Sequence, residues 1–300
     1  MTRVARINGL DVTITGGPIK VARMEQEWYE DLENPDGMMK ELAGEGVDIF
    51  TFWQRYPDVA PKYSHYREED DIAVLPISTY EEWWTKQISS RTRGAIRKSA
   101  KQGLVVKEAE YTDEFVRGMT SIFNETPMRQ GRPFWHYGKD FETVKRQFSK
   151  YLFRETLIGA YWEDELIGFM MIGLAGPYAV TGQIISKIGH RDKGTNNSLI
   201  AKAVEVCAER KIPYLIYLRW TKGSLTEFKR RNGFEKVAMP RYYVPLTATG
   251  RIALRVGLHK GVVNLLPETT VSRLKHFRTK AYRAAYSLKY GSARLADGDA

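Results

Sequence analysis

Apolar and polar positions along residues 104–247 alternate with two periods, one typical of strands and one of helices. The expected order is a strand at 104–111, helices at 112–126 and 141–153, strands at 155–163, 165–175 and 178–188, a helix at 196–210, a strand at 213–220, a helix at 224–231, and paired strands at 233–239 and 241–247. The three successive strands predict an antiparallel meander. The passage from strand to helix to strand across 178–220 predicts a parallel pair with a right-handed crossover. We therefore expect an α/β protein with a mixed, mostly antiparallel central sheet.

The first 103 residues have the pattern of a further α/β region. Strands are expected at 47–57 and 71–78, followed by a helix at 79–103. Thr79 is a candidate cap of this helix, and Gly103 is a candidate stop. The expected organisation has three parts: an N-terminal α/β region (1–103), a central domain (104–247) and a basic helical tail (248–300).

Composition narrows the class of protein. The 300 residues, 43% of them apolar, suffice for a sizeable core. The single cysteine, Cys207, excludes a disulfide framework and a cysteine-built metal site. The N-terminus lacks the apolar segment of a secretion signal, and the least polar stretch, 166–180, is too short and too interrupted by Gly and Pro to span a bilayer. We expect a cytoplasmic protein.

The net charge of +10 is concentrated in the tail. Residues 248–300 hold ten Lys or Arg against three acidic residues, a net charge of +7. The apolar positions of the predicted helix share one face: Leu274, Phe277, Ala281, Ala285 and Leu288. This pattern fits a helix that docks by its apolar stripe and exposes a basic face. It also fits contact with tRNA or with an anionic membrane, which would make the protein peripheral to the inner membrane face.

A polar segment stands where the strand at 178–188 turns into the helix at 196–210. The first N–H groups of a helix lack intrahelical partners and carry the positive end of the helix dipole, so they attract anions. Gly194 would let a phosphate approach the backbone, and Arg191 and Lys193 add positive charge. The alternative is an ordinary polar loop that caps a helix, because neither Walker spacing nor a dinucleotide fingerprint is present.

This segment matches Arg-x-x-Gly-x-(Gly/Ala) at Arg191, Gly194 and Asn196, with Asn in place of the last small residue. Together with the order of elements and the Asn232-Gly233 pair before a strand, it resembles the GNAT (Gcn5-related) acyltransferase superfamily over residues 104–247. The resemblance implies acetyl-CoA or another acyl-CoA as donor, with its pantetheine arm between the fourth and fifth strands. It implies donor contacts at Ser186, Lys187, Arg191, Lys193, Gly194, Thr195, Asn196, Asn197, Ser198 and Lys229.

Two further features are similar to the FemAB-type branch. They are the stretch RTRGAIRKSAKQG before a strand and the Phe228-Lys229 pair. Members of this branch carry tandem GNAT-like domains and transfer amino acids from aminoacyl-tRNA to a cell-wall precursor. By this resemblance, residues 1–103 would be a degenerate GNAT-like half, since they contain no second diphosphate loop.

Acyl transfer to an amine needs a neutral nucleophile, an oxyanion donor and a proton for the leaving thiolate. The GNAT resemblance implies a tyrosine acid in the helix at 224–231, but that helix has none. Tyr242 or Tyr243 is therefore the expected substitute. The implied oxyanion donor is a backbone N–H on the strand at 178–188.

The loop at 124–140 is expected to bind the acceptor. Arginines can pair with carboxylate or phosphate, and aromatic rings can stack on a sugar or base. The candidates are Arg129, Arg132, Trp135 and Tyr137, with His136 or Glu125 as the base that deprotonates the amine. Alternatively, the aromatic residues only anchor a long loop.

Three functions fit these features. The first is transfer of an acyl group from acyl-CoA to a primary amine on an anionic molecule, such as a cell-envelope sugar or precursor. The second is a FemAB-type transferase that uses aminoacyl-tRNA. The third is a non-catalytic module of the same fold bound to a membrane or to RNA, suggested by the missing tyrosine. No metal is expected, because the five histidines are scattered.

Overall fold

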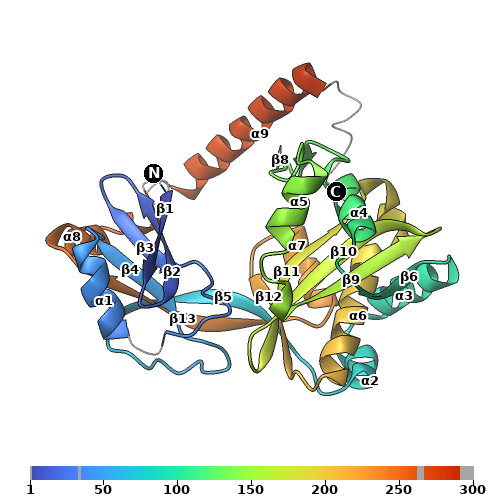
Figure 1. Cartoon of the computed structure of the whole chain (residues 1–300), viewed down its shortest axis with the longest axis horizontal. Coiled ribbons are helices and arrows are strands. Elements are labelled where there is room, and N and C mark those ends of the chain that lie inside the picture. The colour runs from blue at the N-terminus through green and yellow to red at the C-terminus, as the bar shows by residue number, and fades with distance from the viewer. Residues whose placement is uncertain (1, 33–34, 262–266, 291–300) are drawn as a thin grey trace. The chain divides into compact units, whose positions relative to one another are not determined.

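The computed structural model describes residues 2–32, 35–261 and 267–290, and the chain divides into two compact units (Figure 1). Unit 1 comprises residues 1–72 and 237–273, and unit 2 comprises residues 73–236 and 274–300. These boundaries differ from those expected from the sequence. The helical stretch at 80–101 belongs to unit 2, whereas residues 237–247 belong to unit 1.

Unit 1 contains a three-stranded antiparallel meander followed by a helix and a parallel strand. Its strands occur in the order β1-β2-β3-β4-β13-β5. Its elements are β1 (Thr2–Ile7), β2 (Leu10–Gly16), β3 (Lys20–Met24), α1 (Pro35–Gly44), β4 (Ile49–Trp53), α8 (Ala248–Arg255) and η4 (Leu258–Lys260). Val21 of β3 pairs in parallel with Ile49 of β4. Two strands, β5 (Tyr66–Pro76) and β13 (Glu235–Pro245), continue from one unit into the other.

Unit 2 also contains a three-stranded antiparallel meander followed by a helix and a parallel strand, and its strands are longer. The strand order in unit 2 is β12-β11-β10-β9-β6. It begins with α2 (Tyr80–Glu82), η1 (Trp83–Gln87), α3 (Ser90–Lys101), β6 (Val105–Ala109), α4 (Asp113–Phe123), β7 (Met128–Arg129), β8 (Arg132–Pro133), α5 (Phe141–Phe148) and η2 (Leu152–Arg154). It continues with β9 (Glu155–Trp162), β10 (Glu165–Leu174), β11 (Tyr178–Ser186), η3 (Ile188–Lys193), α6 (Thr195–Glu209), β12 (Tyr214–Arg219) and α7 (Ser224–Arg231). The last helix, α9 (Glu268–Tyr290), lies in unit 2 from Leu274 onward.

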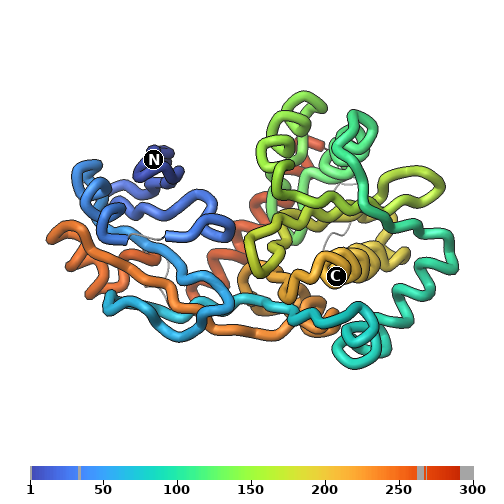
Figure 2. Tube along the Cα trace, turned by 60° about the horizontal axis from the view of Figure 1, so that its bottom comes forward, coloured from blue at the N-terminus to red at the C-terminus, as the bar shows by residue number. Residues whose placement is uncertain are grey.

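Alternation along the strands places the two helical layers of unit 2. Ile158 and Met170 pack with α6, while their neighbours Leu157 and Phe169 pack with α4. Because successive strand side chains point to opposite faces, α6 and α4 cover opposite faces of the sheet. Figure 2 shows α6 running along one side of these strands. The predicted mixed, mostly antiparallel sheet is confirmed, including the parallel pair β11–β12.

Several predicted ends are confirmed by their local geometry. The Thr79 hydroxyl accepts a hydrogen bond from the Glu82 N–H, and Gly103 takes a positive φ of 94° after α3. The predicted single helix at 79–103 is wrong, however. It is interrupted at Ile88, which is extended, and α3 begins afresh with Ser89 as its cap.

The predicted pair of strands at 233–239 and 241–247 is also wrong. They form one continuous strand, β13. Residues 241–245 pair with β4 of unit 1, so Arg241 lies opposite Trp53, and no turn forms around Pro240. Among the described helices, none is long and apolar enough to cross a membrane.

Candidate functional site

Strands β11 and β12 part after only three paired residues. They pair in parallel from Tyr178 opposite Tyr214 to Val180 opposite Ile216, and no farther. Beyond Val180, β11 remains paired with β10 on its other side as far as Ser186. We call the segment where β11 and β12 no longer pair the β11–β12 split.

Irregular backbone on both strands produces the split. Gly182 is an extra residue in β11, because Thr181 and Gln183 pair with the consecutive residues Ile172 and Met171 of β10. Such a bulge bends a strand and increases its twist. On β12, Leu218 has a positive φ of 46°, which is strained for a branched side chain. Among the described residues, the backbone N–H groups of β11 that face the split therefore have no strand partner.

The far end of β11 leads through η3 into the N-terminus of α6. Within the part of the chain that the structure describes, the N–H groups of Thr195 and Asn196 have no acceptor, whereas those of Asn197 and Ser198 bond to the Gly194 carbonyl. The Thr195 hydroxyl is buried and also has no partner. A fifteen-residue helix that begins without a side-chain cap is a suitable anion site.

The sequence suggested that Gly194 leaves open space for an anion, but in the structure this space is filled. Gly194 has a positive φ of 64°, and a Cβ at this position would lie 2.5 Å from Ser99 Oγ of α3. The glycine is therefore required by the close approach of α3. The first turn of α6 is exposed at Asn196.

The cationic side chains of the segment are engaged to different degrees. Lys187 pairs with Glu165, and the Lys193 ammonium lies 3.8 Å from the centroid of the Trp162 ring. Arg191 is exposed. The Ser186 carbonyl accepts a hydrogen bond of 2.9 Å from the Arg129 guanidinium. These contacts hold the segment in place and leave it positively charged.

Lys229 is buried beside the split. Its ammonium donates to the carbonyl oxygens of Tyr217 (2.7 Å) and Arg219 (2.6 Å) at the end of β12. Only 2% of Lys229 is exposed, and burial lowers its pKa to about 8. The side chain was expected to contact phosphate. It instead bonds to the part of β12 beyond Ile216, the last residue that pairs with β11, and two of the three N–H donors of its ammonium are used.

Asn232 joins this lysine-bearing helix to α6. Its Nδ2 donates to Asn197 Oδ1 over 3.0 Å and to the Phe228 carbonyl, and its own carbonyl accepts from the Trp83 indole. Gly233 follows with a φ of 88°, which ends α7. In the Asn-Gly pair noted in the sequence, Asn232 therefore links α7 to the first turn of α6 by a hydrogen bond, and Gly233 ends α7.

The predicted catalytic bases do not lie free in the split. Glu125 accepts hydrogen bonds from the N–H groups of Ile188 (2.6 Å) and Gly189 (2.9 Å) and from Arg129 (3.1 Å). A carboxylate with three donors caps the start of η3 and is poorly placed to take a further proton. His136 is 1% exposed and stacks on Phe123 at 4.2 Å, and burial together with the Lys139 ammonium lowers its pKa to about 4. Its stacking on Phe123 anchors the loop.

The predicted acid, Tyr242, lies in the core of unit 1. It is fully buried, and its hydroxyl donates to Gln54 and accepts from the Lys62 N–H. A hydroxyl with both roles filled cannot protonate a leaving group. Tyr243, the alternative, is also in unit 1 and packs against His259.

The predicted acceptor loop divides into structural and exposed residues. Arg129 is structural, since its guanidinium bonds to the carbonyls of Ser186 and Ile122. Arg132 is exposed on β8, and Trp135 is 73% exposed. Tyr137 packs edge-on against Tyr290 of α9 at 5.4 Å. Arg132 and Trp135 thus remain available for an acceptor.

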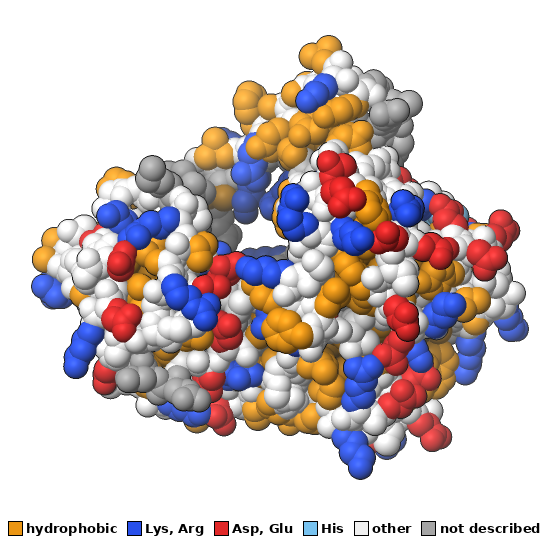
Figure 3. Space-filling model, viewed as in Figure 1, with side chains coloured by type: hydrophobic (Ala, Val, Ile, Leu, Met, Phe, Trp, Pro, Cys, Tyr) orange, Lys and Arg blue, Asp and Glu red, His pale blue; other side chains and the backbone are white. Residues whose placement is uncertain are grey.

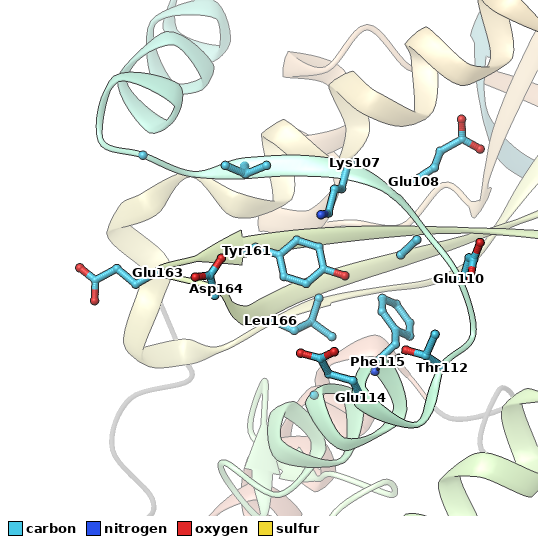
Figure 4. A pocket seen from close by; sticks show the side chains of 14 residues that line it. Lys107, Glu108, Glu110, Thr112, Glu114, Phe115, Tyr161, Glu163, Asp164 and Leu166 are labelled. Carbon is cyan, nitrogen blue, oxygen red and sulfur yellow. Dashed lines mark hydrogen bonds between the residues drawn. The ribbon is translucent and has the colours of Figure 1, made fainter.

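A separate groove of about 840 Å³ lies between β6, α4 and the β9–β10 hairpin (Figure 4). It is acidic, and Figure 4 shows Lys107 pointing toward the ring of Tyr161. None of the residues predicted to bind donor or acceptor lines it. Over the described ranges, no group of three or more His, Cys, Asp or Glu side chains is arranged to hold a metal.

The sequence did not reveal that α3 covers Gly194 or that Glu125 caps η3. The only signal was the stretch RTRGAIRKSAKQG, which supplies α3. The contacts themselves join residues 63 or more positions apart, and no local pattern encodes them.

Comparisons with known proteins agree with this architecture. Neither a scan against protein-family models nor a search of curated proteins finds a match. Among solved structures, the C-terminal domain of a protein described as a lysylphosphatidylglycerol synthetase from Agrobacterium fabrum matches with a TM-score of 0.57 and 11% identity, over 85% of this chain and 87% of that chain. FemX matches with 0.55 and 11%, over 85% and 90%, and L-PGS from Bacillus licheniformis with 0.54 and 13%, over 85% and 88%. At these identities the matches show the fold alone, and together with the β11–β12 split they confirm that the chain has the predicted GNAT fold.

Proposed function

We propose that the protein is an N-acyltransferase that moves an acyl group from acyl-CoA to a primary amine. The observation that carries this proposal is the placement of the buried Lys229 ammonium on the carbonyl oxygens of Tyr217 and Arg219, in the part of β12 that no longer pairs with β11. The split offers unpaired backbone N–H groups of β11, and the N-terminus of α6 offers two more at its far end. A thioester with a diphosphate tail fits this arrangement: the thioester would accept from the N–H groups of β11, and the diphosphate from those at the N-terminus of α6.

The residues suggest how transfer would proceed. The neutral amine attacks the thioester carbonyl carbon, a C–N bond forms, the C–S bond breaks, and the nitrogen releases its extra proton to water. Backbone N–H groups of β11 facing the split would stabilise the oxyanion. Lys229 would give a proton to the leaving thiolate, because a pKa of about 8 keeps it largely protonated at pH 7 yet readily deprotonated. Lys229 would then take the role of the tyrosine that α7 lacks.

The acceptor would enter past the exposed residues of the acceptor loop. Arg132 suits a carboxylate or phosphate on the acceptor, and Trp135 suits a sugar or base. An anionic cell-envelope sugar or precursor with a primary amine has this chemistry.

A thermal-shift screen tests the donor. Acetyl-CoA, longer acyl-CoAs and free coenzyme A should raise the melting temperature, since a ligand that binds only the folded state stabilises it by RT ln(1 + [L]/Kd). Lys229→Met should keep this shift and lose transfer to an amine panel. No shift with any coenzyme A compound would refute the donor assignment.

A second candidate is an aminoacyl-tRNA-dependent transferase, and the close packing of α3 against Gly194 favours it. Because α3 occupies the space there, the phosphate approach is narrower than the sequence implied. FemX and L-PGS are also among the structures that share this fold. In this case, aminoacyl transfer from charged tRNA would be observed, and acetyl-CoA would not raise the melting temperature.

A further inference from the structure

The last helix packs by the face opposite to the one expected. Thr279, Tyr286 and Tyr290 share one side of α9 and are partly buried, and Tyr290 contacts Tyr137 of the acceptor loop. The apolar stripe instead faces outward. Leu274 is 53%, Phe277 75% and Leu288 90% exposed. The expectation that α9 docks by this stripe is therefore wrong.

The stripe is continuous along the helix. At about 100° per residue, its members fall within roughly 100° of the helix circumference. They are Leu274, Phe277, Ala281, Ala284, Ala285 and Leu288. Hydrophobic side chains gather along α9 in Figure 3. A patch of this kind on a folded protein marks an interaction site.

Basic residues border the stripe on both sides. Arg273 and Lys280 follow one edge, and Arg278 and Lys289 follow the other. Between residues 269 and 290 there is no acidic side chain. The long stems of Lys and Arg can lie along an apolar surface while their charges reach an anionic layer above it.

This charge pattern selects the partner. A second copy of α9 would bring like charges together beside the seam, in either orientation of the two helices. An RNA backbone would satisfy the charges but leave Phe277 and Leu288 in water. An anionic lipid surface satisfies both, because apolar side chains enter the acyl boundary and basic ones meet the head groups.

We propose that α9 is an interfacial helix that binds the surface of an anionic phospholipid bilayer through this stripe. The proposal does not depend on the acyltransferase assignment, since binding is measured without turnover.

Flotation of the full chain with vesicles tests it. Phosphatidylcholine vesicles with and without phosphatidylglycerol are compared, for wild type, for Leu274→Ser/Phe277→Ser/Leu288→Ser, and for a matched variant, Phe153→Ser/Ile252→Ser. The matched variant removes exposed apolar side chains away from α9 (82% and 62% exposed). Circular dichroism verifies that each variant remains folded.

Wild type and the matched variant should bind the anionic vesicles, with partition at least about tenfold weaker for the stripe variant. Binding should also weaken as ionic strength rises from about 0.1 M to about 1 M, where screening shortens from about 10 Å to 3 Å. Equal vesicle binding by stripe variant and wild type, or none by either, overturns the proposal. The proposal is likewise overturned if wild type binds no vesicles and instead dimerises through the stripe. It is also overturned if wild type binds no vesicles but binds tRNA, with the same affinity as the stripe variant.

Discussion

Asn232 Nδ2 donates a hydrogen bond of 3.0 Å to Asn197 Oδ1, and this contact ties the end of α7 to the first turn of α6. It connects the two parts of the candidate site, because α7 carries Lys229 and α6 offers the anion-binding N–H groups. Asn232 is completely buried, so the contact is protected from water. The relative position of these helices is therefore set by a polar joint as well as by packing.

Removing the hydrogen bond between Asn232 and Asn197 should lower the free energy of unfolding in a non-additive way. We expect a coupling energy of about 1 kcal/mol between Asn232→Ala and Asn197→Ala, a typical net value for one hydrogen bond. Urea unfolding of the two single variants and the double variant measures it. Additive losses would mean that the two side chains act independently.

The free energy of unfolding should depend on pH through the protonation of His136. Its pKa is about 4 in the folded protein against 6.5 in an ordinary environment, so the unfolded chain binds a proton first as the pH falls. The free energy of unfolding should decrease from about pH 6.5 down to about pH 4, by an amount on the order of 3 kcal/mol. His136→Phe should flatten this part of the curve. An unchanged slope in the variant would show that other groups cause the loss.

Lys229 should govern the alkaline limb of the pH–rate profile. A lysine that donates a proton is active below its pKa of about 8, so turnover should fall above that pH. Lys229→Arg, which stays charged, should lose this limb, and Lys229→Met should reduce kcat about 10²- to 10⁴-fold. A rate that rises through pH 8 would instead assign Lys229 as a base.

Lys229 also has a readout that needs no activity. Between about pH 8 and 10.5 the unfolded chain keeps the lysine proton that the folded chain has lost, so stability should rise with pH relative to Lys229→Met. Unfolding curves at pH 7.5 and at about pH 10 compare the two. A constant difference between the proteins would contradict the burial-lowered pKa.

Glu125 should act as a structural cap. Glu125→Gln removes the charge that holds the N–H groups of Ile188 and Gly189, at an expected cost of about 1–3 kcal/mol. Glu165→Gln is the matched control, since the Glu165 side chain that pairs with Lys187 is 52% exposed and the pair should contribute at most about 1 kcal/mol. Equal losses in the two variants would argue against the cap, and so would full stability of Glu125→Gln.

Sequence patterns predicted what is encoded locally. The cap at Thr79, the stop at Gly103, the antiparallel meander and the parallel β11–β12 pair follow from short-range rules and are found in the structure. The predictions that failed depend on contacts between distant segments. Residues 241–245 pair with β4, and Tyr242 is committed to Gln54, 188 positions away. Glu125 looked like a base because its partners, the backbone N–H groups of η3, carry no side-chain signal.

Calorimetric titration of acetyl-CoA tests the central claim most directly, in wild type and in Asn196→Asp. Asn196 is exposed at the open N-terminus of α6, where a carboxylate is tolerated by the helix but repels a diphosphate. Gln147→Glu is the control with the same change of charge, since its bond to Lys139 is kept. The account predicts saturable binding to wild type and control, weakened at least about tenfold in Asn196→Asp. Absence of binding to wild type, or equal affinity in all three proteins, would contradict it.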